Sequence, residues 1–204
     1  MDNFKFAAIG SRDASKEYLD LMSDIVYYLL MKGGEGSSGA ASGMDTAAFK
    51  GGCAYADLMN VDLPMEIWIP WEGFYDVEND RFKYAFRLMT DGHLQFAESI
   101  LETSGVVKGI KWLKENKQGV YRLFCRNVYQ IYLGSKEKVD FVVYAAPEND
   151  KGKVKGGTRV AVDLARHLDI PTFNITKRED LITLRTLTGY NADHNHLVKK
   201  TRKF

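Results

Sequence analysis

This chain of 204 residues has few cysteines and no long apolar run. Its two cysteines, Cys53 and Cys125, lie far apart without the spacing of metal ligands, so we expect reduced thiols and no disulfide. No stretch approaches the roughly 18 apolar residues of a membrane span. No apolar segment follows the first residues as it does in a signal peptide. We therefore expect a cytoplasmic protein that contacts no membrane.

The sequence also lacks an excess of charge of either sign. Lys and Arg number 28 and Asp and Glu number 27, which gives a net charge of +1. This balance excludes a chain that binds nucleic acid over its whole surface, so any such surface must be a local patch. The composition is that of a globular protein with a core, because 45% of the residues are apolar and 27% are charged.

Several catalytic and cofactor motifs are absent. The pattern Gly-x-x-x-x-Gly-Lys-Ser/Thr does not occur, which disfavours a P-loop ATPase. No serine lies in a Gly-x-Ser-x-Gly elbow, so a hydrolase triad has no support. His194 and His196 have a spacing that suits a metal on a strand, but no third ligand lies nearby. We expect neither a metal nor a cofactor.

Strand-like and helix-like segments alternate along the chain, which predicts a parallel sheet with helices on both faces. We expect one α/β domain over residues 1–190, Rossmann-like and doubly wound, with a mainly parallel sheet. Short apolar runs and apolar positions at helical spacing locate its elements. The expected strands cover 4–9, 34–39, 65–70, 139–145 and 170–175, and the expected helices 15–31, 44–56, 80–89, 93–101, 120–133, 158–168 and 178–187.

Two regions stand apart from this pattern. Residues 73–119 are expected to form a helical insertion, within which 105–119 is ambiguous. Residues 191–204 are expected to form a tail that ends in a basic run, Lys199 to Lys203. The basic run either touches phosphate or is a solvated end.

Three turns of small residues follow expected strands and precede expected helices. Gly10-Ser11-Arg12 offers a close backbone approach, a hydroxyl donor and a cation. Between Ser38 and Asp45, Gly39 and Gly43 bracket small residues, and Asp45 either caps the helix or binds a ribose hydroxyl. The third turn is Lys155-Gly156-Gly157-Thr158, followed by Arg159. Because the carboxyl ends of parallel strands share one edge of a sheet, the three turns together predict a phosphate site.

Aromatic side chains are the other candidates for contact with a nucleotide. A base could stack on Trp68, Trp71, Trp112, Phe74 or Tyr75. Trp68 and Trp71 are better explained as strand and core aromatics, because of where they fall in the apolar pattern.

The turns resemble a known family. Gly10-Ser11-Arg12 and Ser38-Gly39-x-Ala41-x-Gly43-Met44-Asp45-x-Ala47-Ala48 resemble the DNA-processing protein A family (DprA or Smf), within the SLOG group of Rossmann-like nucleotide-binding domains. Arg126-Asn127 resembles the start of the family's Arg-Asn-Arg element, and Gly157-Thr158 its later turn. The resemblance implies binding of single-stranded DNA in DNA processing or recombination. It further implies a recombinase as partner and self-association into a homodimer.

The chain departs from this family in its cationic contacts. Ser42 and Val128 stand where the family usually has arginine, and Phe49 where it has histidine. Each lost phosphate contact weakens nucleic-acid binding and lowers its dependence on salt. The first alternative is therefore a sensor or sequestering protein for a small or cyclic nucleotide.

A second alternative is a nucleoside-monophosphate N-glycosidase, because some SLOG relatives cleave the base with a Pro-Gly-Gly-x-Gly-Thr-x-x-Glu motif. Here Ala161 takes the place of that glutamate. Cleavage through an oxocarbenium-like state needs a carboxylate, which Asp45 or Glu35 would have to supply. Binding is therefore favoured over catalysis. The predicted phosphate-binding residues are Gly10, Ser11, Arg12, Ser38, Gly39, Gly43, Asp45, Arg126, Gly157 and Thr158.

Overall fold

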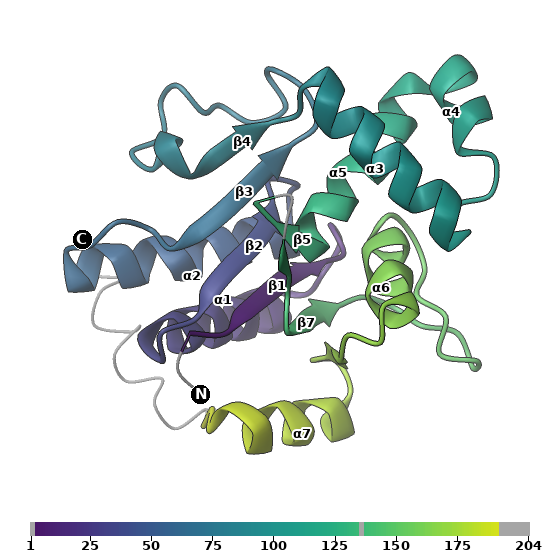
Figure 1. The fold of residues 1–204 in the computed structure, drawn as a ribbon. Coiled ribbons are helices and arrows are strands. Elements are labelled where there is room, and N and C mark those ends of the chain that lie inside the picture. The colour runs from purple at the N-terminus through teal and green to yellow at the C-terminus, as the bar shows by residue number, and fades with distance from the viewer. Residues whose placement is uncertain (1–2, 135–136, 192–204) are drawn as a thin grey trace.

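A six-stranded sheet with helices on both faces forms the centre of the molecule (Figure 1). The computed structural model describes residues 3–134 and 137–191. The strand order is β4-β3-β2-β1-β7-β8, and every neighbouring pair is parallel. This arrangement confirms the predicted α/β, doubly wound fold. The strands are β1 (Lys5–Gly10), β2 (Glu35–Gly39), β3 (Met65–Ile69), β4 (Phe86–Leu88), β7 (Phe141–Ala145) and β8 (Thr172–Asn174), with a separate antiparallel pair, β5 (Tyr132–Leu133) and β6 (Glu137–Lys138).

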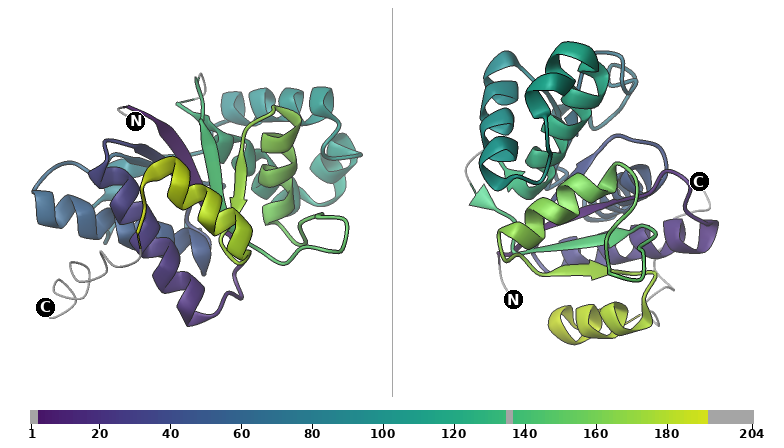
Figure 2. Two further views of the ribbon diagram at one scale, coloured as in Figure 1. Left: turned by 90° about the horizontal axis from the view of Figure 1, so that it is seen from below. Right: turned by 90° about the vertical axis from the view of Figure 1, so that its right-hand side faces the viewer.

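Helices form a layer on each side of the sheet, as the edge view in Figure 2 shows. Helices α1, α2 and α7 pack on one face, and α3, α5 and α6 on the other, where α4 packs on α5. The helices are α1 (Lys16–Met31), α2 (Met44–Met59), α3 (Asp91–Ser104), α4 (Ile110–Asn116), α5 (Gln118–Ile131), α6 (Thr158–His167) and α7 (Arg178–Thr188), with a short 3₁₀ turn, η1 (Lys83–Ala85).

The central strand β1 is apolar throughout because both of its faces are buried. Phe6 and Ala8 pack into the core beneath α1 and α2, whereas Ala7 and Ile9 pack into the core beneath α5 and α6. Successive side chains of a strand point to opposite faces, so a strand in the middle of such a sheet shows no polar alternation.

The order of the strands reverses between β1 and β7. From β1 the chain enters α1 on one face of the sheet, and from β7 it enters α6 on the other. The two connections therefore diverge at the carboxyl ends of these strands, where Gly10 pairs with Ala145. In open α/β sheets this switch point is where a crevice forms and ligands bind.

The sequence-based expectation was wrong for residues 80–89, which we predicted to be a helix. Only Lys83–Ala85 turn helically, and Phe86–Leu88 form the edge strand β4, where Phe86 pairs with Ile67. Pairing with β3 outweighs the local helical spacing. The insertion contains α3 and α4, and Thr90 begins α3 through a reciprocal capping box with His93.

Other expectations concern the thiols, the tail and the membrane. Cys53 and Cys125 are both free, as predicted. His194, His196 and the basic run from Lys199 to Lys203 lie outside the described residues. Among the helices that the structure describes, none combines the length and the apolar character that crossing a bilayer requires.

Candidate functional site

A cleft of about 400 Å³ opens at the switch point between β1 and β7. One wall is the segment after β1, the opposite wall is the first turn of α6 with the loop before it, and α5 closes the side. Of the predicted site residues, the following line the cleft: Gly10, Ser11, Arg12, Asp45, Arg126, Gly157 and Thr158.

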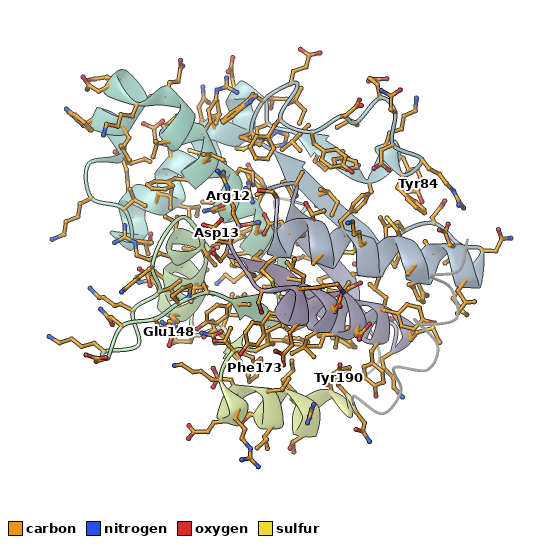
Figure 3. The ribbon with its side chains drawn as sticks, turned by 180° about the vertical axis from the view of Figure 1, so that it is seen from behind. Arg12, Asp13, Tyr84, Glu148, Phe173 and Tyr190 are labelled. Atoms are coloured by element: carbon orange, nitrogen blue, oxygen red, sulfur yellow. The ribbon has the colours of Figure 1, made fainter. Side chains whose placement is uncertain are left out.

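The wall after β1 is built by close backbone packing. A Cβ on Gly10 would lie 2.4 Å from the Ala145 carbonyl oxygen, so only glycine fits there. The Ser11 N–H donates to that same oxygen at 2.8 Å. Arg12 and Asp13 are exposed at the end of this wall (Figure 3). The Arg12 guanidinium forms no hydrogen bond or ion pair with any described residue, so it is free to meet an anion.

The opposite wall is the open N-terminus of α6. Gly156 has a φ of +77°, and no atom lies within 4 Å of a Cβ built on Gly156 or Gly157. The N–H groups of Gly157 and Thr158 donate to no group in the described parts of the chain. The Asn127 amide fixes this turn by donating to the Gly157 carbonyl at 2.9 Å. A helix start with free N–H groups and a positive dipole end favours an anion.

A buried ion pair lies at the base of the cleft. Arg126 Nη1 and Asp45 Oδ2 are 3.0 Å apart, and the side chains are 5% and 4% exposed. The other Asp45 oxygen accepts from the Gly10 N–H at 3.3 Å. Burial raises the pKa of Asp45, and the Arg126 guanidinium opposes that rise. Arg126 is therefore committed to Asp45, although its buried Nε has no hydrogen-bond partner among the described residues.

Gln130 joins this pair to the floor. In one orientation of the amide, its nitrogen lies 3.3 Å from Asp45 Oδ2. With the amide turned over, its oxygen accepts from the Gly39 N–H at 3.1 Å and its nitrogen donates to Asn127 Oδ1 at 3.1 Å. In both orientations Gln130 connects α5 with the residues beneath the cleft.

The remaining predicted residues, Ser38, Gly39 and Gly43, lie beneath the cleft and do not line it. The Ser38 hydroxyl donates to the Ala8 carbonyl at 2.6 Å, which ties β2 to β1. Gly39 leaves room for the guanidinium, since a Cβ there would lie 1.9 Å from Arg126 Nη1. Gly43 lets the start of α2 approach the backbone of Ser11 and Arg12. These three residues shape the walls from below.

The other residues singled out from the sequence lie in the core, on the surface or away from the cleft. Trp68 is buried and its ring stacks on Tyr129 at 4.3 Å, which confirms it as a core aromatic. Phe49 and Val128 are buried, whereas Ser42 is exposed. Glu35 begins β2 and so lies at the edge of the sheet away from the cleft. Within 3–134 and 137–191, no three metal-ligating side chains come together.

The sequence did not identify every residue of the cleft. Asp13, an exposed carboxylate, was missed, and so was the apolar wall that α5 supplies with Val120, Leu123 and Phe124. Helical spacing predicted the helix but not which of its faces lines a cleft. The α5 residues buried in the core are Tyr121, Cys125, Val128, Tyr129 and Ile131. The signal available in the sequence was that this helix carries apolar residues on two faces, more than one core contact needs. Comparison with known proteins adds no family, because no family model, curated protein or solved structure matches this chain.

Proposed function

We propose that the cleft binds a nucleotide unit through its phosphate. The observation that carries this proposal is the pairing of two unsatisfied groups in one cleft, the start of α6 and the Arg12 guanidinium. Free N–H groups at a helix start bind phosphate oxygens, and an arginine adds a bidentate cation. Lys155 lines the same cleft and is exposed, so it adds a second free cation.

The side wall suits the rest of a nucleotide. Val120, Leu123 and Phe124 give an apolar surface beside the polar end of the cleft. A cleft of about 400 Å³ lies within the range of small-ligand sites and suits one nucleotide unit. The Arg126–Asp45 pair stabilises the floor rather than the ligand, because both side chains are buried against each other.

Binding of single-stranded DNA is the second candidate, and the resemblance to the DNA-processing protein A family supports it. Fewer cations than that family uses are free here, since Arg126 is paired and Ser42 and Val128 carry no charge. A nucleotide unit therefore ranks ahead of a long strand as the ligand of the cleft itself. A recombinase partner and self-association stay predictions of the resemblance.

Calorimetric titration of the full chain tests the proposal. The probes are the common nucleoside 5′-monophosphates and an oligothymidylate, each across a salt series. We expect one monophosphate to bind with one-to-one stoichiometry. Arg12→Ala should weaken it by about tenfold or more, because hydrogen bonds to charged groups contribute about 1.5–3 kcal/mol. Arg178→Ala is the matched control, since Arg178 is an exposed arginine at the start of α7 that does not line the cleft.

The remaining outcomes separate the alternatives. Oligothymidylate binding that weakens steeply with salt, without monophosphate binding, would favour the DNA-binding candidate. Release of free base from the bound monophosphate would show an N-glycosidase, with Asp13 as the exposed carboxylate of the cleft to test. Absence of binding by every probe would overturn the proposal.

A further inference from the structure

A second cavity, of about 660 Å³, adjoins the cleft. The loop between α3 and α4 lines it together with residues of α4, α5 and α6 and Lys153 of the loop before α6. Phe124 lines both spaces, and Thr158 of the cleft is followed directly by Arg159 of the cavity. Lys155, which lines the cleft, and Lys153, which lines the cavity, likewise come from one loop. The cavity is therefore a continuation of the cleft along the same side of the molecule.

The cavity is basic, and its basic groups are unpaired. Lys108, Lys153 and Arg159 line it, all three are exposed, and none forms an ion pair with a described residue. Asp163 is its one acidic lining residue in the described chain. Cleft and cavity together have six basic and three acidic lining residues, an excess of three positive charges in a chain whose net charge is +1. The overall charge balance implies that any nucleic-acid surface is a local patch, and these residues form such a patch.

The cavity also has a large aromatic side chain at its rim. Trp112 is 53% exposed, whereas Trp68 is 2% exposed and Trp71 is half-buried against Phe74. Lys117 Nζ lies 5.7 Å from the centroid of the Trp112 ring, which adds another cation at this end. An exposed indole among unpaired cations is the combination that holds a base by stacking and its phosphate by charge.

We infer that this cavity is a subsite for a second nucleotide unit, joined through phosphate to the unit in the cleft. Trp112 stacks on the second base, while Arg159 and Lys153 contact the phosphate between the units. The inference rests on the proposed function, since the cleft must bind the first unit. It assigns the segment around α4, within the insertion, to ligand binding.

Paired titrations of the full chain test this inference. The probes are the best-bound nucleoside monophosphate and the 5′-phosphorylated dinucleotide of the same base. We expect the dinucleotide to bind roughly tenfold more tightly or better, since stacking contributes about 1–3 kcal/mol per base. Trp112→Ala should abolish this gain and leave the monophosphate affinity unchanged. Trp112→Phe should retain most of the gain because phenylalanine also stacks.

Variants that each remove one positive charge test the electrostatic part of the inference. Lys153→Ala and Arg159→Ala should reduce dinucleotide affinity severalfold, whereas Lys151→Ala should not, because Lys151 is exposed on the same loop but lines neither space. Tryptophan fluorescence gives an independent signal. The dinucleotide should quench it in the wild type and not in Trp112→Phe.

The results distinguish the two proposals. A dinucleotide that binds no more tightly than the monophosphate, or a gain that survives in Trp112→Ala, would overturn the second subsite and leave the proposed function standing. If neither probe binds, both proposals fail. A cyclic dinucleotide assayed alongside the linear one shows whether the two units come from a strand or from a free signalling nucleotide, and tighter binding of either supports the subsite.

Discussion

The turn between β2 and α2 and the turn between β7 and α6 look alike in sequence but differ in their surroundings. Each follows a parallel strand, has a glycine of positive φ near its end and opens a helix at the same edge of the sheet. At α2 the Met44 N–H donates to the Ser11 carbonyl at 3.1 Å and the Thr46 N–H to the Ala41 carbonyl at 3.2 Å. At α6 the N–H groups of Arg159 and Val160 donate to the carbonyls of Gly156 and Gly157 at 3.3 Å, but those of Gly157 and Thr158 have no described partner.

This contrast separates two uses of glycine. In the β2–α2 turn, glycine lets other parts of the chain pack closely, and the helix start is closed by the protein's own groups. In the β7–α6 turn, glycine leaves empty space before an open helix start. A pattern of glycines before a helix therefore indicates a close approach, and only the packing shows whether protein or ligand makes it.

The largest expected effect comes from a matched pair of glycine substitutions. Gly43 and Gly156 both have positive φ, +85° and +77°, so alanine strains the backbone at each. On Gly43 a Cβ would also lie 2.5 Å from the carbonyl oxygens of Ser11 and Arg12, whereas Gly156 has open space. We expect Gly43→Ala to lower the free energy of unfolding by more than about 4 kcal/mol and Gly156→Ala by about 1–2 kcal/mol. Urea unfolding measures both, and equal losses would contradict the closed-turn description.

The second prediction concerns the buried Arg126–Asp45 ion pair beside the turn between β2 and α2. Arg126→Met leaves the Asp45 carboxylate buried without its cation, which costs about 3 kcal/mol or more. Burial raises the folded-state pKa of Asp45, and the variant removes the charge that opposes the rise. A raised folded-state pKa means that stability is lost as the pH rises above the unfolded value of about 3.9.

The loss of stability of Arg126→Met relative to wild type should therefore grow as the pH rises above about 4. Adding Asp45→Asn to this variant makes the side chain neutral, so the pH dependence should disappear and part of the stability should return. A penalty that is independent of pH in the single variant would mean that Arg126 does not influence the folded-state pKa of Asp45.

The sequence predicted the fold well because the signals that define it are local. The apolar run of β1 and the helical spacing of α1 are readable within their own segments. Strand β4 was missed because three residues become a strand only through their pairing with β3. In the site, the turns were located from their glycines, but Arg126 lies 81 residues from Asp45, and no local pattern shows that the two pair. The apolar wall on α5 was likewise not predicted, because spacing alone does not tell a core face from a cleft face.

The third prediction concerns the loop that positions the open turn. The Glu148 side chain is 4% exposed and accepts from Arg166 Nη2 at 3.0 Å, and it also contacts Tyr144 and Lys177. Burial acts to raise the pKa of Glu148, but hydrogen bonds from Lys177, Tyr144 and Arg166 outweigh it and lower the pKa. A lowered folded-state pKa gives stability that is present above the unfolded value of about 4.3 and is lost as the pH falls.

Replacing that carboxylate tests how firmly the loop is anchored. Glu148→Gln should lower stability by about 1–2 kcal/mol at neutral pH, a modest loss because Arg166 and Lys177 are partly exposed. The difference from wild type should shrink as the pH falls below about 4.3, where the carboxyl becomes protonated in the unfolded chain and then in the folded one. A difference that stays constant with pH would show that the side chain acts through packing alone.

The smallest expected effect distinguishes two lysines of that same loop. Lys155 and Lys151 are both exposed and unpaired among the described residues, but only Lys155 lines the cleft. An exposed charge pair contributes up to about 1 kcal/mol, so Lys155→Ala should weaken the bound monophosphate about threefold to fivefold. Lys151→Ala should leave the affinity unchanged, and neither variant should alter urea unfolding. Because net charge falls equally in both, any difference in affinity comes from position, and equal affinities would place the phosphate away from the open start of α6.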